Sequence, residues 1–347
     1  MSSDFMGNKQ TSRNYASTIP FPSDYPDGYE LLEDALVYDP KRHLQLEQPE
    51  QIWLLKDFGY GEDQIAKCAS PVAVSSPFRL LSYEGSDALH QVAQTLKAQS
   101  THIEGSRVPK HLAGGVYRSK FLRDLCSCPY ILRHMSEIAQ TDLVPHSMPS
   151  QQLYINYAPE DVSKAVDAWH FDGIGFDYVI MVSDPTTMKG GNFEYFQGTR
   201  EEIAELFQMQ VHQVRYGIAE ELPAHRVIKT EFPAAGYAIF QQGNMVVHRA
   251  ARLLEPADRI TIVPGLVALD TTVEDPTAKH DMPDYGEPGI YAELGRHSAW
   301  LAKEKLDALI GQMAIDSSSD AVREALQQAV VDVTDTLNYL GKEKSGS

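Results

Sequence analysis

The sequence contains few cysteines, no long apolar run and fewer basic than acidic residues, and each shortage excludes a class of protein. The 3 cysteines, Cys68, Cys126 and Cys128, match neither a disulfide framework nor the spacing of a four-ligand zinc site. No run of roughly 18 or more apolar residues exists, which excludes a membrane-spanning helix. The segment that follows Met1 lacks the apolar core of a secretory signal. We therefore expect a reduced, cytoplasmic protein without a membrane partner.

Basic residues are outnumbered, with 30 Lys and Arg against 48 Asp and Glu and a formal net charge of −18. An acidic surface repels phosphate backbones, so we expect no nucleic-acid partner. Hydrophobic residues make up 43% of the chain, and 347 residues are enough to bury a sizeable core. The composition is therefore that of an ordinary globular protein with one large domain or two modest ones.

The first two of four segments differ in texture. Residues 1–28 are polar and punctuated by Pro, Ser and Gly, which predicts a flexible leader, with a lid over a site as the alternative. Residues 29–150 are mainly helical in pattern and are expected to support the segment that follows them. Helices are predicted over 48–58 with a stop at Gly59, from an N-cap at Ser86 onward, and around 119–125 and 129–140.

Short β-branched or aromatic runs, separated by Gly, Pro, Asp and Asn, fill residues 151–283. They read QQLYINY, DYVIMV, GGNFEYF, HRVIKTEF, GYAIF, NMVVH and RITIVPGLVAL, and a helix is inserted at TREEIAELFQMQ. About seven or eight closely spaced strands without alternating helices predict an antiparallel sandwich or jelly roll. The predicted fold is thus mainly β with flanking helices, built on a double-stranded β-helix, a cupin-like jelly roll.

Residues 284–341 return to a helical pattern and are predicted to form a C-terminal helical pair. Such amphipathic stripes usually pack against the parent sheet or against each other, and a homodimer interface is the alternative. The two stripes consist of Ala299, Ala302, Leu306, Leu309 and Met313, and of Val322, Leu326, Ala329, Val333, Leu337 and Leu340.

Two polar side chains in the run WHFD, His170 and Asp172, are the first candidates for chemistry. Side chains alternate with period two along a strand, so an imidazole and a carboxylate two residues apart face the same side. One imidazole and one carboxylate are two thirds of a facial metal triad. The pair alone is also compatible with a buried histidine beside a solvated acid.

The third ligand is predicted at His248, which ends the run NMVVH. Gly243 and Asn244 give a hairpin signal before it, and in a jelly roll this strand returns beside the one that carries His170. Two imidazoles and one carboxylate would then occupy one face of a metal and leave three positions open. That arrangement suits ferrous iron, which must bind both a cosubstrate and dioxygen.

A cation follows in an otherwise apolar strand, at Arg259 in the run ADRITIV. An unpaired buried arginine is costly, so Arg259 requires an anionic partner inside the barrel. The far carboxylate of a dicarboxylate cosubstrate could form a bidentate pair with it. Thr261, two residues later on the same face, can add a hydroxyl.

The order H-x-D, distal His, then Arg-x-Ser/Thr resembles the Fe(II)/2-oxoglutarate-dependent dioxygenase superfamily over roughly 151–269. The run GGNFEYFQGT is similar to one in its phytanoyl-CoA hydroxylase-like branch of small-molecule tailoring enzymes. The resemblance implies that His170, Asp172 and His248 ligate Fe(II), and that Arg259 holds the far carboxylate of 2-oxoglutarate. O2 would be the second cosubstrate, and hydroxylation, desaturation, cyclisation or epimerisation would follow C–H abstraction, typically in secondary metabolism.

Further site residues follow from the resemblance. Tyr154 and Asn156 share a strand face with Gln152, at a position that often steadies 2-oxoglutarate in the superfamily, although core packing is an equal alternative for Tyr154. Halogenating relatives carry a small residue in place of Asp172, so the carboxylate argues against halogenation. A small-molecule substrate is expected, because an acidic chain without a basic groove does not suit histones or nucleic acids. Candidate substrate contacts are Arg107, Arg118 and Arg249.

Two rival functions remain open. A cupin-type metalloenzyme that does not use oxoglutarate, or a zinc hydrolase, could share the ligands, but neither has a reason to bury Arg259. A non-catalytic scaffold member is the second rival, against which the intact triad argues. His212 and His225 are expected to be surface or structural residues, because no Arg-x-Thr strand follows them.

Overall fold

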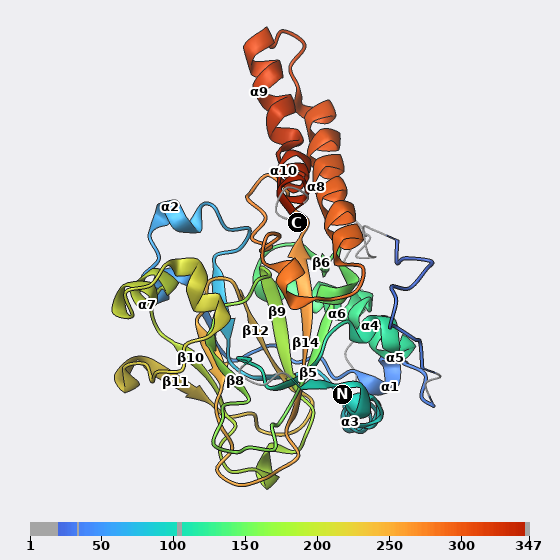
Figure 1. The fold of residues 1–347 in the computed structure, drawn as a ribbon, viewed down its shortest axis with the longest axis vertical. Coiled ribbons are helices and arrows are strands. Elements are labelled where there is room, and N and C mark those ends of the chain that lie inside the picture. The colour runs from blue at the N-terminus through green and yellow to red at the C-terminus, as the bar shows by residue number, and fades with distance from the viewer. Residues whose placement is uncertain (1–19, 33–34, 103–105, 344–347) are drawn as a thin grey trace, which may run out of the picture.

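The computed structural model describes residues 20–32, 35–102 and 106–343. They form a sheet-rich body from which the C-terminal helices project (Figure 1). Two antiparallel sheets make up this body, and helices from the N-terminal half cover the outer face of the larger sheet. The predicted architecture, a double-stranded β-helix with flanking helices, is confirmed.

The larger sheet has 10 strands and the smaller has 4. The larger sheet runs β1-β2-β12-β9-β14-β7-β5-β4, with β3 beside β12 and β6 beside β14, and the smaller runs β11-β10-β13-β8. The strands of the larger sheet are β1 (Ile52–Leu54), β2 (Val72–Ser75), β3 (Phe78–Arg79), β4 (Thr101–His102), β5 (Lys110–Leu112), β6 (Leu143–Pro145), β7 (Leu153–Tyr157), β9 (Phe176–Met181), β12 (Tyr237–Gln241) and β14 (Ile260–Ala268). Those of the smaller sheet are β8 (Asp167–His170), β10 (Phe193–Phe196), β11 (Val227–Thr230) and β13 (His248–Ala250).

Strand β7 shows how the alternation of side chains separates the core from the interior of the barrel. Leu153, Ile155 and Tyr157 are buried against the helices, whereas Tyr154 and Asn156 point the other way and are partly exposed. Strand β9 is buried along its whole length, because helices cover one of its faces and the second sheet covers the other. The barrel interior is therefore lined by every second residue of β7 and its neighbours.

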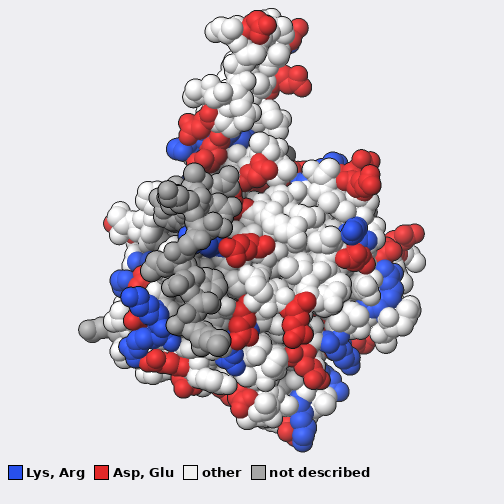
Figure 2. All heavy atoms as spheres, turned by 180° about the vertical axis from the view of Figure 1, so that it is seen from behind, with Lys and Arg blue, Asp and Glu red and all other residues white. Residues whose placement is uncertain are grey.

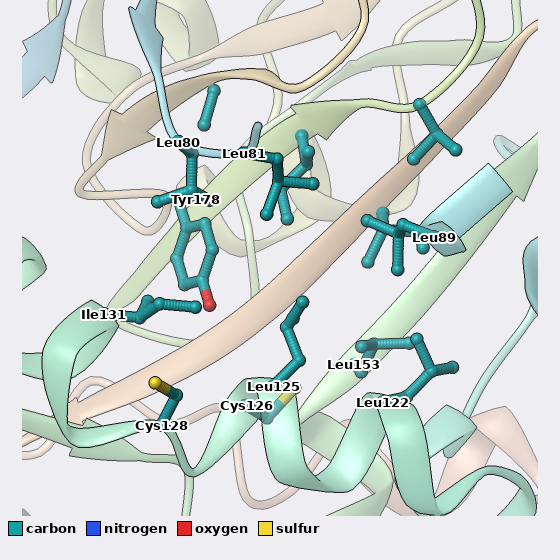
Figure 3. Close-up of a cluster of buried hydrophobic side chains, with 14 of the residues drawn as sticks. Leu80, Leu81, Leu89, Leu122, Leu125, Cys126, Cys128, Ile131, Leu153 and Tyr178 are labelled. Carbon is teal, nitrogen blue, oxygen red and sulfur yellow. The ribbon is translucent and has the colours of Figure 1, made fainter. Parts of the chain in front are cut away.

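The N-terminal helices contribute the main hydrophobic core, whose close-up shows Leu122, Leu125 and Cys126 beneath the strand residues Leu153 and Tyr178 (Figure 3). The cysteines are unpaired, and Cys126 and Cys128 are buried in this core. The helices are α1 (Pro40–His43), α2 (Glu62–Ile65), α3 (Tyr83–Leu96), α4 (Gly115–Arg118), α5 (Lys120–Cys126) and α6 (Pro129–Ala139). The helices predicted around 119–125 and 129–140 correspond to α5 and α6.

Two predicted details of this region were wrong. The N-cap of α3 is Ser82, whose hydroxyl accepts a hydrogen bond from the N–H of Gly85, and Ser86 lies one turn inside the helix. The helix predicted over 48–58 is replaced by β1 and a single 3-10 turn, Leu55–Phe58, which Gly59 ends at φ 92°. Pairing of β1 with β2 overrides the local helical pattern there.

The leader is described only from residue 20 onward, and residues 1–19 lie outside the described part. Phe21 and Tyr25 pack against the ring of Tyr117, with centroid distances of 5.2 and 5.7 Å. The predicted segment boundaries at 28, 150 and 283 stay predictions.

The C-terminal segment forms α8 (Ile290–Gln312), α9 (Ser319–Ala329) and α10 (Val331–Glu343), while α7 (Arg200–Leu206) is the helix inserted among the strands. The second predicted helix is thus divided at Val330. The first half of α8 is buried on the body through Leu294, Trp300 and Leu301, whereas its outer half projects with α9 (Figure 1). Among the described residues, every helix is too short or too polar to cross a bilayer.

Candidate metal centre and cosubstrate pocket

The two histidines of the predicted triad meet where two strands of the smaller sheet pair. His170 ends β8, His248 begins β13, and the two residues are direct partners in the register, with ring centroids 4.3 Å apart. The chain does return beside His170, as predicted, but it crosses from the larger to the smaller sheet on the way rather than forming a hairpin.

Asp172 does not lie on the strand, contrary to the prediction. It follows β8 in an irregular segment, where its N–H donates a 2.8 Å hydrogen bond to the carbonyl of Gly243. The turn before β13 therefore fixes Asp172, and this contact brings its carboxylate back toward the two imidazoles. The ligand atoms of His170, Asp172 and His248 all lie within 4.8 Å of one another.

Hydrogen bonds set the tautomers of both histidines. Nδ1 of His170 lies 2.7 Å from the carbonyl oxygen of Ala168, and Nδ1 of His248 lies 3.0 Å from that of Val246. Each Nδ1–H donates to a carbonyl, so each Nε2 keeps its lone pair. These Nε2 atoms face Asp172, at 3.3 Å from Oδ1 for His170 and 3.4 Å from Oδ2 for His248.

The protonation states also suit a metal. Burial lowers the pKa of His248 to about 4, and the neighbouring His170 lowers it further. Burial alone would raise the pKa of Asp172, but His248 and His170 outweigh it and hold the pKa below its ordinary value. At neutral pH the site therefore offers a neutral imidazole and a carboxylate, the ligating forms. Two nitrogens and one oxygen on one side of a cavity fit a divalent first-row metal such as iron(II).

The cavity in front of the triad has a volume of about 410 Å³. All the predicted site residues line it. They are His170, Asp172 and His248, with Tyr154, Asn156, Arg259 and Thr261. Thr261 and Asn156 are register partners on β14 and β7, and Val263 pairs with Tyr154, so these side chains form one wall. Gln152, which precedes β7, is turned away and donates to the carbonyl of His146 at 2.7 Å.

Arg259 is 1% exposed and carries no acidic partner among the described residues. Its Nε donates a 2.7 Å hydrogen bond to the carbonyl of Gly191, and its Nη1 lies 3.5 Å from the hydroxyl of Thr261. Burial lowers the pKa of Arg259 to about 10, against which Asp167 acts, so the guanidinium stays charged at neutral pH. It is a buried cation that faces the cavity, and no carboxylate of the described residues forms an ion pair with it.

The structure places two of the three candidate substrate contacts at the cavity and the third outside it. Arg107 and Arg249 line the cavity, where Arg107 pairs with Asp167 at 2.6 Å and Arg249 with Glu194 at 2.7 Å. Arg118 lies elsewhere, with its guanidinium 4.5 Å from the ring centroid of Tyr29. As predicted, His212 and His225 are exposed and outside the cavity.

Several cavity residues were missed at the sequence level. Asp177 and Gln241 are the only residues with a carboxyl or amide side chain in the runs FDYVIM and YAIFQ. A polar side chain inside an apolar strand needs a partner, so the sequence did contain a signal that could have identified them. Met282 and Glu287 reach the cavity from the segment before α8, for which the sequence holds no comparable signal.

The comparisons with known proteins add the following. The nogalamycin-biosynthesis epimerase SnoN, described as non-heme and alpha-ketoglutarate dependent, is 14% identical over 62% of this chain and 83% of its own, with a TM-score of 0.43. The carbocyclase SnoK of the same pathway is 13% identical over 69% and 95%, also at 0.43. A prolyl 4-hydroxylase structure from Phytophthora capsici is 12% identical over 93% and 95%, at 0.38. No curated protein matches the sequence.

The phytanoyl-CoA hydroxylase-like branch suggested by the sequence stays a prediction. A family model adds direct evidence from the sequence. It is described as Halogenase D and matches residues 94–284, more than half of the chain and most of the β core. The chain therefore belongs to the Halogenase D family.

Proposed function

We propose that the protein is an iron(II)- and 2-oxoglutarate-dependent oxygenase that oxidises a small molecule, in secondary-metabolite biosynthesis. The observation that carries this proposal is the buried guanidinium of Arg259, which lies in the same cavity as the triad and has no acidic partner among the described residues. A buried cation without a counter-ion costs stability, and a dicarboxylate cosubstrate would remove that cost on binding. An oxoglutarate-independent cupin enzyme or a zinc hydrolase has no such requirement.

In this proposal His170, Asp172 and His248 hold the iron. When bound, the iron would supply the redox chemistry that couples oxidative decarboxylation of 2-oxoglutarate to C–H abstraction from the substrate. The protein side chains position 2-oxoglutarate and remove it from water. Arg259 binds its far carboxylate as a bidentate pair, and Thr261 adds a hydroxyl donor. Tyr154 and Asn156 form the wall of the pocket beside them.

Asp172 decides between oxygenation and halogenation. A halide needs a ligand position on the metal, and the Asp172 carboxylate fills one of the three protein positions. We therefore propose hydroxylation, or a desaturation, cyclisation or epimerisation that starts from the same abstraction, in spite of the name of the family.

The size of the cavity supports a small substrate. About 410 Å³ must hold both 2-oxoglutarate and the target, which leaves space for a metabolite rather than for a folded partner. On the face shown in Figure 2, basic side chains lie singly or in small groups among acidic ones, which does not favour a polyanion.

Anaerobic titration with Fe(II) and then 2-oxoglutarate tests the proposal. We expect a metal-to-ligand charge-transfer band that is absent from His170→Ala, and one that needs much more 2-oxoglutarate in Arg259→Met. Arg259→Lys keeps the charge but loses the planar fork, and we expect intermediate affinity. Metal binding without any 2-oxoglutarate band would favour the cupin-type alternative. Iron and 2-oxoglutarate binding with no metabolite able to stimulate succinate release would favour a non-catalytic member.

We further propose that two copies of the chain associate through the projecting helices. Apolar side chains there have no cover, with Ile310 81% and Leu337 64% exposed. Covering them with a second copy would remove apolar surface from water. Light scattering on the wild type and on an Ile310→Lys, Leu337→Lys variant tests this, and a monomeric wild type would overturn it.

The cytoplasmic location predicted from the sequence is likewise a proposal, which cell fractionation would test.

A further inference from the structure

Two buried polar residues outside the triad lie directly behind Asp172. Asp177 on β9 and Gln241 on β12 are register partners, and both are 0% exposed. The other residues at these two strand ends are apolar. A buried polar side chain lowers stability unless it forms hydrogen bonds, so the hydrogen-bond partners of Asp177 and Gln241 indicate their role.

The Gln241 amide nitrogen lies within reach of three groups of the site. Nε2 is 2.9 Å from Oδ1 of Asp177, 3.3 Å from Oδ2 of Asp172 and 3.1 Å from Nε2 of His248. An amide nitrogen carries two hydrogens, and all three groups can accept one. Once a metal takes the lone pair of His248 Nε2, the oxygens of Asp177 and Asp172 are the two acceptors that remain for them.

Asp172 is held on its remaining sides by the turn at Gly243. The Gly243 carbonyl accepts from the Asp172 N–H, and a Cβ at Gly243 would lie 2.3 Å from Oδ2 of both Asp172 and Asp177. Only glycine lets the two carboxyl groups approach this turn. Oδ1 of the same carboxylate lies 3.3 Å from Nε2 of His170, and Oδ2 lies 3.4 Å from Nε2 of His248.

We propose that Gln241, anchored by Asp177, is a positioning residue that fixes the orientation of the Asp172 carboxylate toward the metal site. Groups that orient a ligating carboxylate commonly change metal affinity by about 10–100-fold when they are lost. This inference rests on the metal site of the proposed function, but it does not require 2-oxoglutarate.

The Gln241 oxygen argues that the amide is placed for the site rather than for folding. Oε1 is buried without a hydrogen-bond partner among the described residues. An amide kept only to stabilise the sheet would satisfy both of its ends, as the neighbouring Gln242 does more nearly when its amide is turned so that the nitrogen donates to the carbonyls of Ser70 at 3.2 Å and Val72 at 2.8 Å. Gln242 is therefore a matched control: it is adjacent, buried and hydrogen-bonded, but it points away from the triad.

The test compares Gln241→Met with Gln242→Met in the full chain. Methionine keeps most of the volume and removes the donor. Anaerobic Co(II) titration measures metal affinity and the ligand-field absorption of the bound ion, and thermal unfolding of the metal-free proteins measures stability. For Gln241→Met we expect about 10–100-fold weaker Co(II) binding, an altered Co(II) spectrum and a melting temperature lowered no more than that of Gln242→Met. For Gln242→Met we expect a lower melting temperature and unchanged Co(II) affinity.

A second comparison tests the anchoring role of Asp177. Asp177→Asn keeps an oxygen that can accept from Gln241, so we expect metal affinity close to that of the wild type, whereas Asp177→Leu should weaken it. Because Asp177 acts through Gln241, the double variant Asp177→Leu, Gln241→Met should bind Co(II) no more weakly than Gln241→Met alone.

A purely structural Gln241 would give the opposite result: a lower melting temperature with Co(II) affinity within twofold of the wild type, which would overturn the inference. A wild-type protein that binds no Co(II) or Fe(II) would overturn both the inference and the proposed function. If the wild type binds metal but no 2-oxoglutarate, the proposed function fails and the predictions for Gln241 still hold.

Discussion

The carbonyl oxygen of Gly191 accepts the Nε–H of Arg259, and the same glycine leaves no space for a side chain against that arginine. A Cβ at Gly191 would be 2.9 Å from Cδ and 3.0 Å from Nε of Arg259. Gly191 also has φ +71°, where a side chain is strained. The second glycine of the GGNFEYF run thus seats the cation proposed to bind 2-oxoglutarate.

Gly191→Ala is expected to displace Arg259 and to raise the dissociation constant of 2-oxoglutarate at least about tenfold, because a bidentate charged pair depends on orientation. The measurement is anaerobic titration of the iron-loaded protein. Gly28→Ala serves as a control, since Gly28 has φ +84° but nothing within 4 Å of its added Cβ. It should cost stability without changing 2-oxoglutarate binding, and equal binding in the Gly191 variant would contradict the role given to this contact.

The hydroxyl of Thr261 is the next testable part of the pocket. Thr261→Val keeps the shape of the side chain and removes a donor worth about 1 kcal/mol, so 2-oxoglutarate should bind about fivefold more weakly. Thr261 is 2% exposed on β14, so the substitution can also lower the stability of the protein. Unfolding of the metal-free variant measures that loss of stability separately from the loss of 2-oxoglutarate affinity. A variant with reduced stability but unchanged 2-oxoglutarate affinity would assign the hydroxyl to the fold alone.

The strands and the triad were predictable because their signals are local or nearly so. Apolar runs with the period of a strand mark β7, β9, β12 and β14, and His170, Asp172 and His248 occur in the order that the fold requires. The burial of Arg259 at the cavity follows its position next to an apolar strand, whereas its role toward an anion stays a prediction. That His170 and His248 would meet was predicted without knowing that β8 and β13 are partners.

The errors arose where tertiary contacts overrule the local pattern. Asp172 reaches the metal site from beyond the strand, because Gly243 holds its backbone, and spacing alone could not distinguish this from a position on the strand. Ser82 caps α3 in place of Ser86, and the first turn of the helix packs against His43, where a Cβ at Gly85 would be 2.1 Å from the carbonyl oxygen. The contributions of Met282 and Glu287 to the cavity depend on the path of the chain between β14 and α8, which no local pattern encodes.

Asp172 is expected to exclude halide from the metal. In the iron- and 2-oxoglutarate-loaded wild type, chloride should leave the charge-transfer band unchanged, whereas Asp172→Ala frees a ligand position and should make the band sensitive to chloride if the two histidines retain the iron. Bromide gives an independent comparison. A chloride-dependent band in the wild type would show that halide reaches the metal beside Asp172, and it would move the proposed reaction toward the family's name.

The buried His146 is expected to make stability depend on pH. Its Nδ1 accepts from the N–H of Met148 at 3.2 Å, its Nε2 lies 3.1 Å from the Thr277 hydroxyl, and its ring stacks on His297 at 5.3 Å. Because Nδ1 is an acceptor, only the neutral ring satisfies these contacts. Burial, with a further contribution from His297, lowers the pKa of His146 to about 3.

In the unfolded chain a histidine has a pKa of about 6.5, so between pH 6.5 and 3 the unfolded state binds more protons than the folded one. The free energy of unfolding should therefore be fully retained above pH 6.5 and should fall below it by up to about 1.4 kcal/mol per pH unit from this residue. Urea unfolding of the wild type and of His146→Gln, from pH 4.5 to 7.5, measures the difference in slope. His212→Gln, which removes an exposed histidine, should keep the wild-type slope. If His146→Gln also keeps the wild-type slope, another group causes the acid sensitivity. The neutral ring of His146 would then not be what stabilises the contact between the segment after β6 and the first half of α8.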